Sequence, residues 1–399
     1  MSSNWAARRH GGNVVDKTVA GQPAGGATVH DPSEAISILL EKVGQPRRHL
    51  SLLLGAGSSM AAGLPDLAGL ADAVRDRLKA PERKQYDRLI DGRNLEVVLS
   101  HLRLTRSLLE SAGGEFDGLT ADTAEALDRS ITGAIATVIS SEEEVPTEAH
   151  ERLAAWLGRS IRASALEVFT TNYDLLLERA FELRGVPYFD GFVGVFRGEF
   201  RPDLIEPDEA PDSARPPAAW VRLWKLHGSV SWVIDDEVTR RIVRLGTYPI
   251  KSPDAMLAIY PSAEKYEESR RMPFLALTDR FRRALASPES TTVTVGYSFG
   301  DKHLNELIFN AAARYQRSEI IALFRGSIPA VVAEQATRFA NFSVYGATEA
   351  ILGGERGGYS SPQAGPGWDG ERALVGDFAN LTSLLTKAER APESEATDG

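Results

Sequence analysis

Four short stretches of the chain combine glycine with polar side chains in patterns that suit chemistry on a nucleotide. The first, LLLGAGSSMAAGLPD over residues 52–66, ends an apolar run with Gly55 and Gly57. Glycine takes backbone angles that other residues avoid and lets a phosphate approach the main chain. The loop therefore predicts a phosphate cradle, although a tight turn after a strand would use the same glycines.

The second and third stretches supply groups that can act on a bound nucleotide. In FTTNYDLLLERAFE, Asn172 and Asp174 follow an apolar run, and alternate residues at a strand end can point into one cleft. Helix capping is the alternative explanation for these two residues. In WKLHGSVSW, His227 is a candidate general base because histidine titrates near neutral pH. A structural histidine is the alternative there.

The fourth stretch, VGYSFGDKHLNELI, contains the end of a β-rich run at Gly296. Gly296 and Ser298 are candidates to line a ribose-phosphate site. Asp301 is expected to cap the helix that follows. Histidines within helical segments are expected to be structural, and these are His101, His150 and His303.

Short apolar strands alternate with helical segments, which predicts an α/β fold with a Rossmann-like, mostly parallel sheet covered on both faces. A helical signal over about residues 67–160 indicates a helical module inserted between the first two strands. We expect a disordered arm over residues 1–30 and one catalytic domain over residues 31–352. A linker, a C-terminal helix and a polar tail are expected over residues 353–399.

Composition narrows the function classes. The 399 residues carry a net charge of -10 and no cysteine. The negative charge argues against nonspecific binding to nucleic acid or anionic membranes. The absence of cysteine excludes disulfides, thiolate metal sites and a cysteine nucleophile. Without a secretory signal or an apolar stretch of membrane-spanning length, the expectation is a cytoplasmic protein with no direct nucleic-acid and no membrane contact.

The order of these stretches resembles that of the sirtuins. Gly55-Ala56-Gly57 and the later Gly63-Leu64-Pro65-Asp66 are similar to the sirtuin motif Gly-Ala-Gly…Gly-Ile-Pro-Asp, with its spacing kept. PTEAH resembles the family's Pro-Thr-x-x-His helix start, and TTNYD resembles its Thr-Gln-Asn-Ile-Asp. LHGS is similar to its His-Gly and GYS to its Gly-Thr-Ser. These blocks span roughly residues 50 to 300.

The resemblance implies that NAD is the ligand and the substrate, and it implies a role for each motif. The loop over residues 55–59 would hold the pyrophosphate, Asp174 would hydrogen-bond the nicotinamide carboxamide, Asn172 would orient the ribose or an attacking water, and His227 would be the general base. The implied catalytic residues are Asn172 and His227, and the implied NAD-binding residues are Gly55, Ala56, Gly57, Ser59, Asp66, Asp174, Gly228, Gly296 and Ser298.

Two departures from the classical sirtuin pattern direct the functional prediction. Leu67-Ala68 stands where classical members have Phe-Arg, and the smaller Leu67 favours access of water. The four-cysteine zinc module is missing, so neither a zinc module nor another metal site is expected. NLEVVLSHL, IYPSAEKY and GYSFGDKHLNELI resemble a divergent bacterial branch that hydrolyses NAD in antiviral defence, in some cases with a HerA-type ATPase.

The sequence therefore predicts a NAD hydrolase that releases nicotinamide and ADP-ribose. A NAD-dependent protein deacylase and a non-catalytic NAD-binding scaffold are the alternatives. Because a constitutive hydrolase would starve its own cell, activity is expected to depend on homo-oligomer assembly or on a partner, with a HerA-type DNA-translocating ATPase as the first candidate. The helical segment near residues 67–160 and the C-terminal LVGDFANLTSLLTKA offer amphipathic faces for subunit contacts or for packing on the chain's own core.

Overall fold

The main sheet carries the candidate site at the carboxyl ends of its central strands. The computed structural model describes residues 28–140, 145–206, 211–236, 241–246, 257–259, 272–361 and 363–388. Within these residues ten strands form one sheet, in the order β1 (Thr28–His30), β15 (Glu355–Tyr359), β14 (Glu349–Leu352), β13 (Phe342–Tyr345), β12 (Glu319–Leu323), β11 (Ser290–Val295), β2 (His49–Leu54), β3 (Glu167–Thr170), β7 (Val221–Lys225) and β4 (Tyr188–Phe189).

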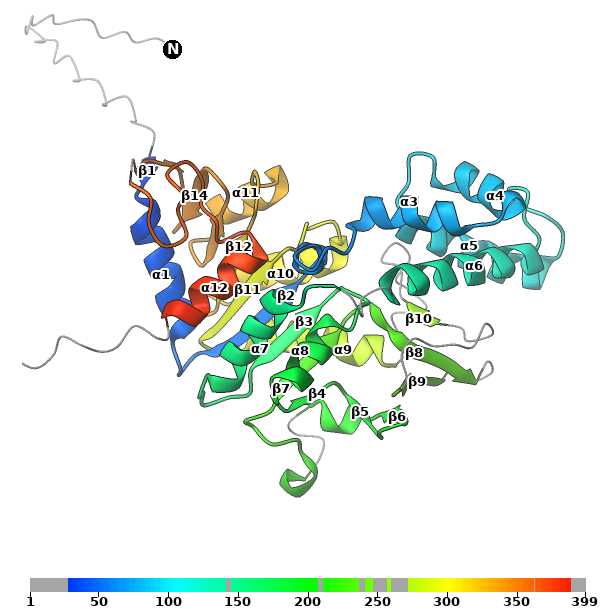
Figure 1. Cartoon of the computed structure of the whole chain (residues 1–399), viewed down its shortest axis with the longest axis horizontal. Helices are drawn as coiled ribbons and strands as arrows, with labels where there is room; N and C mark the ends of the chain where they lie inside the picture. The colour runs from blue at the N-terminus through cyan, green and yellow to red at the C-terminus, as the bar shows by residue number, and fades with distance from the viewer. Residues whose placement is uncertain are drawn as a thin grey trace, which may run out of the picture.

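The strand pairs from β13 across to β4 are all parallel, whereas β14 runs antiparallel to both of its neighbours. Central strands such as β2 and β11 are buried almost throughout, as expected for strands covered on both faces. Where they carry polar residues these are paired in register, as Ser51 Oγ is with Thr292 Oγ1 at 2.8 Å. The α/β fold with a mostly parallel sheet is therefore confirmed (Figure 1).

Helices cover both faces of this sheet. One layer packs around Leu39, Trp156, Phe181 and Leu381 and consists of α1 (Pro32–Gly44), α7 (Glu148–Arg159), α8 (Leu176–Leu183) and α12 (Phe378–Ala388). The opposite layer consists of α9 (Phe274–Ala286), α10 (Lys302–Arg314) and α11 (Ala330–Arg338). Both layers bury continuous apolar surface, so the sheet forms the rigid platform from which loops at the strand ends project.

A separate helical module and a small antiparallel sheet lie beside this core (Figure 1). The module consists of α3 (Leu67–Arg77), α4 (Ala80–Ile90), α5 (Leu95–Ala112) and α6 (Ala121–Ser140). The small sheet has the order β10 (Leu257–Ile259), β8 (Gly228–Asp236), β9 (Arg241–Leu245), β6 (Arg197–Phe200) and β5 (Phe192–Val193). Val230, Val233 and Val243 of the small sheet share the hydrophobic cluster of the module, which anchors the module next to β8 and β9.

Three short helical turns complete the described elements: α2 (Ala56–Met60), η2 (Pro202–Leu204) and η3 (Asp212–Ala214). The first of these is the continuation of the glycine loop after β2. It is only five residues long, so it reorients the chain between β2 and the helical module.

The structure corrects the expected internal boundaries. The helical module ends with α6, because α7 packs against α8 and α12 on the main sheet. The segment after residue 352 is not a linker, since β15 pairs with both β1 and β14. Residues 28–30 likewise form β1 rather than part of a disordered arm. The remainder of that arm, residues 1–27, and the polar tail, residues 389–399, lie outside the described residues.

Candidate functional site

The candidate site lies where the direction of chain progression along the sheet reverses. From β2 the chain proceeds through β3 to β7 on one side, whereas β11, β12 and β13 follow each other on the other side. Ligands of open α/β sheets bind at the carboxyl ends of strands at such a switch point. The five strands β7, β3, β2, β11 and β12 are adjacent, and four spacings of about 4.8 Å place their ends over about 19 Å.

A cavity of about 1100 Å³ opens along the carboxyl ends of these five strands. It is lined by ten of the eleven residues singled out from the sequence, namely Gly55, Ala56, Gly57, Ser59, Asp66, Asn172, Asp174, His227, Gly296 and Ser298. The exception is Gly228, which begins β8 with φ +91 and does not belong to the lining. Asp66 also caps α3 by accepting the Gly69 N–H at 2.8 Å, so its position in the cavity wall coincides with a structural role.

The glycines of the first loop are required by a close approach of two loops. A Cβ on Gly55 would lie 2.5 Å from Gly296 O, and one on Gly57 would lie 2.6 Å from Gly296 Cα. Gly296 itself has φ +64, and its own Cβ would lie 2.6 Å from Ser58 N. The N–H of Gly57 donates to Gly296 O at 2.9 Å, so this donor is satisfied within the protein. The main role of these glycines is therefore to let the loop after β2 contact the loop after β11. That contact also shapes the part of the cavity wall that the glycines line.

Asn172 ties the end of β3 to the same loop. Its Nδ2 donates to Gly55 O at 3.0 Å, Ser58 Oγ at 3.0 Å and Ser59 Oγ at 2.7 Å. The Ser59 hydroxyl in turn donates to Asp174 Oδ2 at 2.5 Å. Asp174 is buried and its Oδ1 accepts the Leu176 N–H at 3.2 Å, so it also supports the start of α8. One oxygen of the Asp174 carboxylate therefore supports the start of α8, and the other accepts the Ser59 hydroxyl.

The side chain of Lys225, which the sequence motifs did not suggest, contacts the loop that carries Asn172 and Asp174. Lys225, at the end of β7, is 3% exposed and donates to the backbone oxygen of Asp174. It also pairs with Glu178 Oε1 at 2.9 Å. Burial raises the pKa of Glu178, and the neighbouring Lys225 ammonium opposes that rise. Lys225 therefore links the strand that carries His227 to the loop that carries Asn172.

His227 is held from the opposite side by Asp301. Its Nε2 lies 3.1 Å from Asp301 Oδ2. Because a carboxylate only accepts, Nε2 carries a proton, and in the neutral imidazole the lone pair is then on Nδ1. Asp301 Oδ1 accepts the His303 and Leu304 N–H groups at 2.8 and 3.2 Å. The expected N-cap role of Asp301 is confirmed, and the structure adds the orientation of His227.

The structure also adds cavity residues that the sequence did not suggest. Glu96, in the first turn of α5, lies with its Oε1 4.0 Å from His227 Nδ1. At the β12 end the cavity is lined by Phe324, Arg325, Gly376 and Asp377. Gly376 is the one residue of this group whose type is locally informative, because a Cβ added to it would lie 2.1 Å from the carbonyl carbon of Phe324. Glu96 lies within NLEVVLSHL, far in sequence from the four glycine-containing stretches, and the Gly376 loop follows all of them, so only tertiary packing brings these residues to the cavity.

His150 is buried beside the site and is expected to make the fold sensitive to acid. It is 1% exposed, and its ring lies 4.9 Å from that of Phe378. Burial lowers the pKa of His150 to about 4, against the opposing charge of Asp174. A lowered folded-state pKa stabilises the fold above the unfolded value of about 6.5, and this contribution is lost as the pH falls from there towards 4.

The expected loss is on the order of 3 kcal/mol of unfolding free energy. Urea denaturation between pH 7 and pH 4 measures it, with His150→Phe as the comparison because it keeps the ring without the titrating group. The variant should lose less stability than wild type over that range. Parallel pH curves for the two proteins would contradict the assignment.

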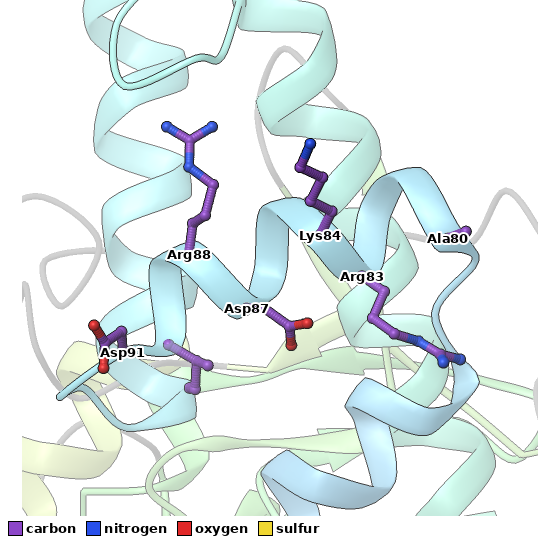
Figure 2. A pocket seen from close by; sticks show the side chains of 7 residues that line it. Ala80, Arg83, Lys84, Asp87, Arg88 and Asp91 are labelled. Carbon is purple, nitrogen blue, oxygen red and sulfur yellow. The ribbon is translucent and has the colours of Figure 1, made fainter.

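A second hollow, of about 820 Å³, lies on α4 and is unrelated to this site (Figure 2). Its charged side chains point apart, with Lys84 and Arg88 on one side of the helix and Arg83 and Asp87 on another. Asp87 already pairs with Arg75 at 2.6 Å. A solvated helix surface explains this hollow fully.

Metal sites and membrane-spanning helices are two further features that would bear on function. No group of three or more His, Asp or Glu side chains in the part of the chain that the structure describes is placed to hold a metal ion. Of the helices in that part, none combines the length and apolar character that crossing a bilayer requires.

Comparison with known proteins identifies a related domain over part of the chain. Residues 166–344 match the family model described as a SIR2-like domain. This range contains Asn172, Asp174, His227 and Gly296, and supports the resemblance to sirtuins noted in the sequence. No curated protein matches the chain. Among solved structures, a Sir2 homologue crystallised in complex with NAD shares 14% identity, covers 89% of this chain and 93% of its own, and superposes with a TM-score of 0.45.

Proposed function

We propose that the protein hydrolyses NAD to nicotinamide and ADP-ribose in this cavity. The observation that carries the proposal is the meeting of His227, oriented by Asp301, and Asn172, anchored on the glycine loop, in one cavity. Both His227 and Asn172 fall within the segment that matches the SIR2-like domain model. A purely binding function would not need a histidine whose free nitrogen is set by a carboxylate partner.

The dimensions of the cavity support a dinucleotide. The strand ends cover about 19 Å, and the volume of about 1100 Å³ is ample for such a ligand. Because β7 and β12 lie at opposite ends of the five-strand row, His227 lies at one end and Arg325 and Asp377 at the other. We therefore place the nicotinamide riboside half near His227 and the adenosine half near β12.

The proposed chemistry breaks the bond between the ribose C1′ and the nicotinamide nitrogen, and the bonding electron pair leaves with nicotinamide. A water oxygen then bonds to C1′, and its proton passes to His227 Nδ1, the nitrogen left free by Asp301. Asn172 contributes by holding the loop beneath the reacting ribose. Leu67 and Ala68 line the same cavity, and these aliphatic side chains favour water as the acceptor since neither supplies an aromatic ring to shield the ribose.

Incubation of the purified protein with NAD tests the proposal directly. Nicotinamide and ADP-ribose are expected in equal amounts, measured by chromatography with mass detection. An acylated peptide included in a parallel reaction distinguishes the deacylase alternative. Acyl-ADP-ribose formed in proportion to the peptide, with negligible cleavage in its absence, would favour deacylation, and ligand binding without any cleavage would favour a scaffold.

We further propose that this activity serves bacterial antiviral defence and is restrained by assembly or by a partner ATPase of the HerA type. The C-terminal helix α12 packs against α7 on the chain's own sheet, so the helical module is the better candidate for subunit contacts. Its helix α5 exposes Leu104 and Leu108, with 55% and 53% of their surfaces accessible. Light scattering and turnover with and without the ATPase test this restraint. A fully active monomer unaffected by the ATPase would contradict it.

A further inference from the structure

The helical module contributes a carboxylate to the reactive end of the cavity. Glu96 follows Asn94, whose side chain caps α5 by accepting the Val97 N–H at 2.9 Å. This cap fixes where α5 begins, and Glu96 therefore projects from the first turn into the cavity lining. Its Oε1 lies 4.0 Å from His227 Nδ1 and accepts the Tyr173 hydroxyl at 3.4 Å.

The surroundings of Glu96 favour a strong electrostatic interaction between its carboxylate and a positive charge in the cavity. Burial and the nearby Glu96 raise the pKa of Tyr173 well above its usual value, so the phenol stays protonated and remains a donor to Glu96. The Glu96 side chain is 18% exposed and that of His227 is 7% exposed. Electrostatic effects at such a partly buried position are stronger than at an open surface.

We propose that Glu96 is a catalytic residue alongside His227, and that its carboxylate stabilises the positive charge that develops on the ribose as nicotinamide leaves. The proposal rests on the proposed hydrolysis of NAD and deepens it. Cleavage moves the charge of the pyridinium nitrogen onto the ribose ring, so a carboxylate near C1′ interacts more strongly with the transition state than with the substrate. The same carboxylate lies next to His227 Nδ1, which receives the proton of the attacking water.

The decisive variant is Glu96→Gln, which removes the charge and keeps the shape of the side chain. We expect kcat to fall by about 100-fold, as for loss of one preorganised electrostatic contact, while the Kd of ADP-ribose changes less than about threefold. Glu96→Asp, which keeps the charge, should recover part of the rate. The matched control is Glu110→Gln on the same helix, where Glu110 is 53% exposed and pairs with Arg106, and its kcat should equal that of wild type.

A binding measurement separates charge stabilisation from simple positioning. The probe is an ADP-ribose analogue whose terminal ring is a protonated pyrrolidine, compared with ADP-ribose itself by calorimetry. Wild type should bind the cationic analogue at least about tenfold more tightly, and Glu96→Gln should lose that preference while keeping its affinity for ADP-ribose.

The outcomes distinguish this inference from the proposed function. If wild type and Glu110→Gln release nicotinamide and Glu96→Gln does so at a similar rate, the role of Glu96 is overturned and the hydrolase proposal stands. A loss of ADP-ribose binding together with a lower melting temperature in Glu96→Gln would also overturn it, because that result indicates a structural role. No cleavage of NAD by wild type would overturn the proposed function, and the catalytic role of Glu96 with it.

Discussion

Replacing His227 by alanine is expected to lower kcat for NAD cleavage by about 10²- to 10⁴-fold, the usual contribution of a positioned general base. The free nitrogen of the imidazole is set by the Asp301 contact at 3.1 Å, so alanine leaves the water proton without its proposed acceptor. The affinity for ADP-ribose should change little, since the glycine loop and the β12 end of the cavity are untouched. Stopped or quenched assays of nicotinamide release, together with calorimetry, measure the two effects.

Two further variants make this result specific. Asp301→Asn keeps the helix cap, because asparagine caps as well as aspartate, but it no longer fixes the protonated nitrogen of His227. Its kcat should fall while its melting temperature stays close to that of wild type. His303→Ala is the matched control, since His303 is an exposed histidine of α10 outside the cavity lining. Full activity in His227→Ala would exclude the histidine as the base.

Asn172→Ala is expected to abolish turnover for a different reason. The amide donates to Gly55 O, Ser58 Oγ and Ser59 Oγ, and alanine removes all three contacts at once. Gly55 O keeps the Ser58 N–H and hydroxyl as donors, and Ser59 Oγ still donates to Asp174. Each oxygen nevertheless loses one donor, at about 0.5–1.5 kcal/mol per hydrogen bond, so the melting temperature and the ADP-ribose affinity should both fall. Near-normal activity at unchanged protein level would show that Asn172 is not part of the site.

Local sequence patterns predicted the cavity residues that lie in short motifs, in which glycines and polar side chains are adjacent in the sequence. Each motif follows the carboxyl end of a strand, and parallel strands bring such ends to one edge. The positions of Gly55, Asn172, His227 and Gly296 around one cavity follow from this rule. The reason for the glycines did not follow, because the contact of Gly57 with Gly296 joins residues on strands that are neighbours only in the folded sheet.

The remaining site residues depend on packing between distant segments. Glu96 reaches His227 because the inserted module docks on β8 and β9 through Val230 and Val243, and no local pattern encodes that docking. Lys225 has the sequence context of an ordinary residue before the His-Gly motif, yet it is buried against Asp174 and Glu178. These contacts form only when α8 folds back onto the strand end of β7, about 50 residues further along the chain.

The expectation of a linker after residue 352 was wrong for a similar reason. A glycine-rich composition after residue 352 is typical of a linker, but the segment pairs with β1, whose residues lie more than 300 positions earlier. Strand pairing satisfies the backbone of glycine-rich residues as well as that of any others. Composition therefore indicated flexibility where long-range hydrogen bonds impose order.

Gly296→Ala is expected to cost about 2–5 kcal/mol of unfolding free energy and to weaken ADP-ribose binding at least about tenfold. The positive φ of +64 disfavours alanine by about 1–2 kcal/mol. A Cβ there would also lie 2.6 Å from Ser58 N and 2.8 Å from Gly57 Cα, and forcing backbone apart costs about 1–3 kcal/mol more. Since the loop after β2 must move away, the Gly57 N–H loses Gly296 O and the cavity floor opens.

Gly63→Ala separates the two causes. Gly63 has φ +83, and an alanine Cβ at this residue would meet no atom within 4 Å, so the substitution brings the backbone strain without the collision. Its stability loss should stay near the strain alone, about 1–2 kcal/mol, and its ADP-ribose affinity should match wild type. Urea denaturation and calorimetry on both variants give the comparison. Equal losses in the two variants would mean that the contact between the β2 and β11 loops contributes nothing, and that the glycines serve only local turns.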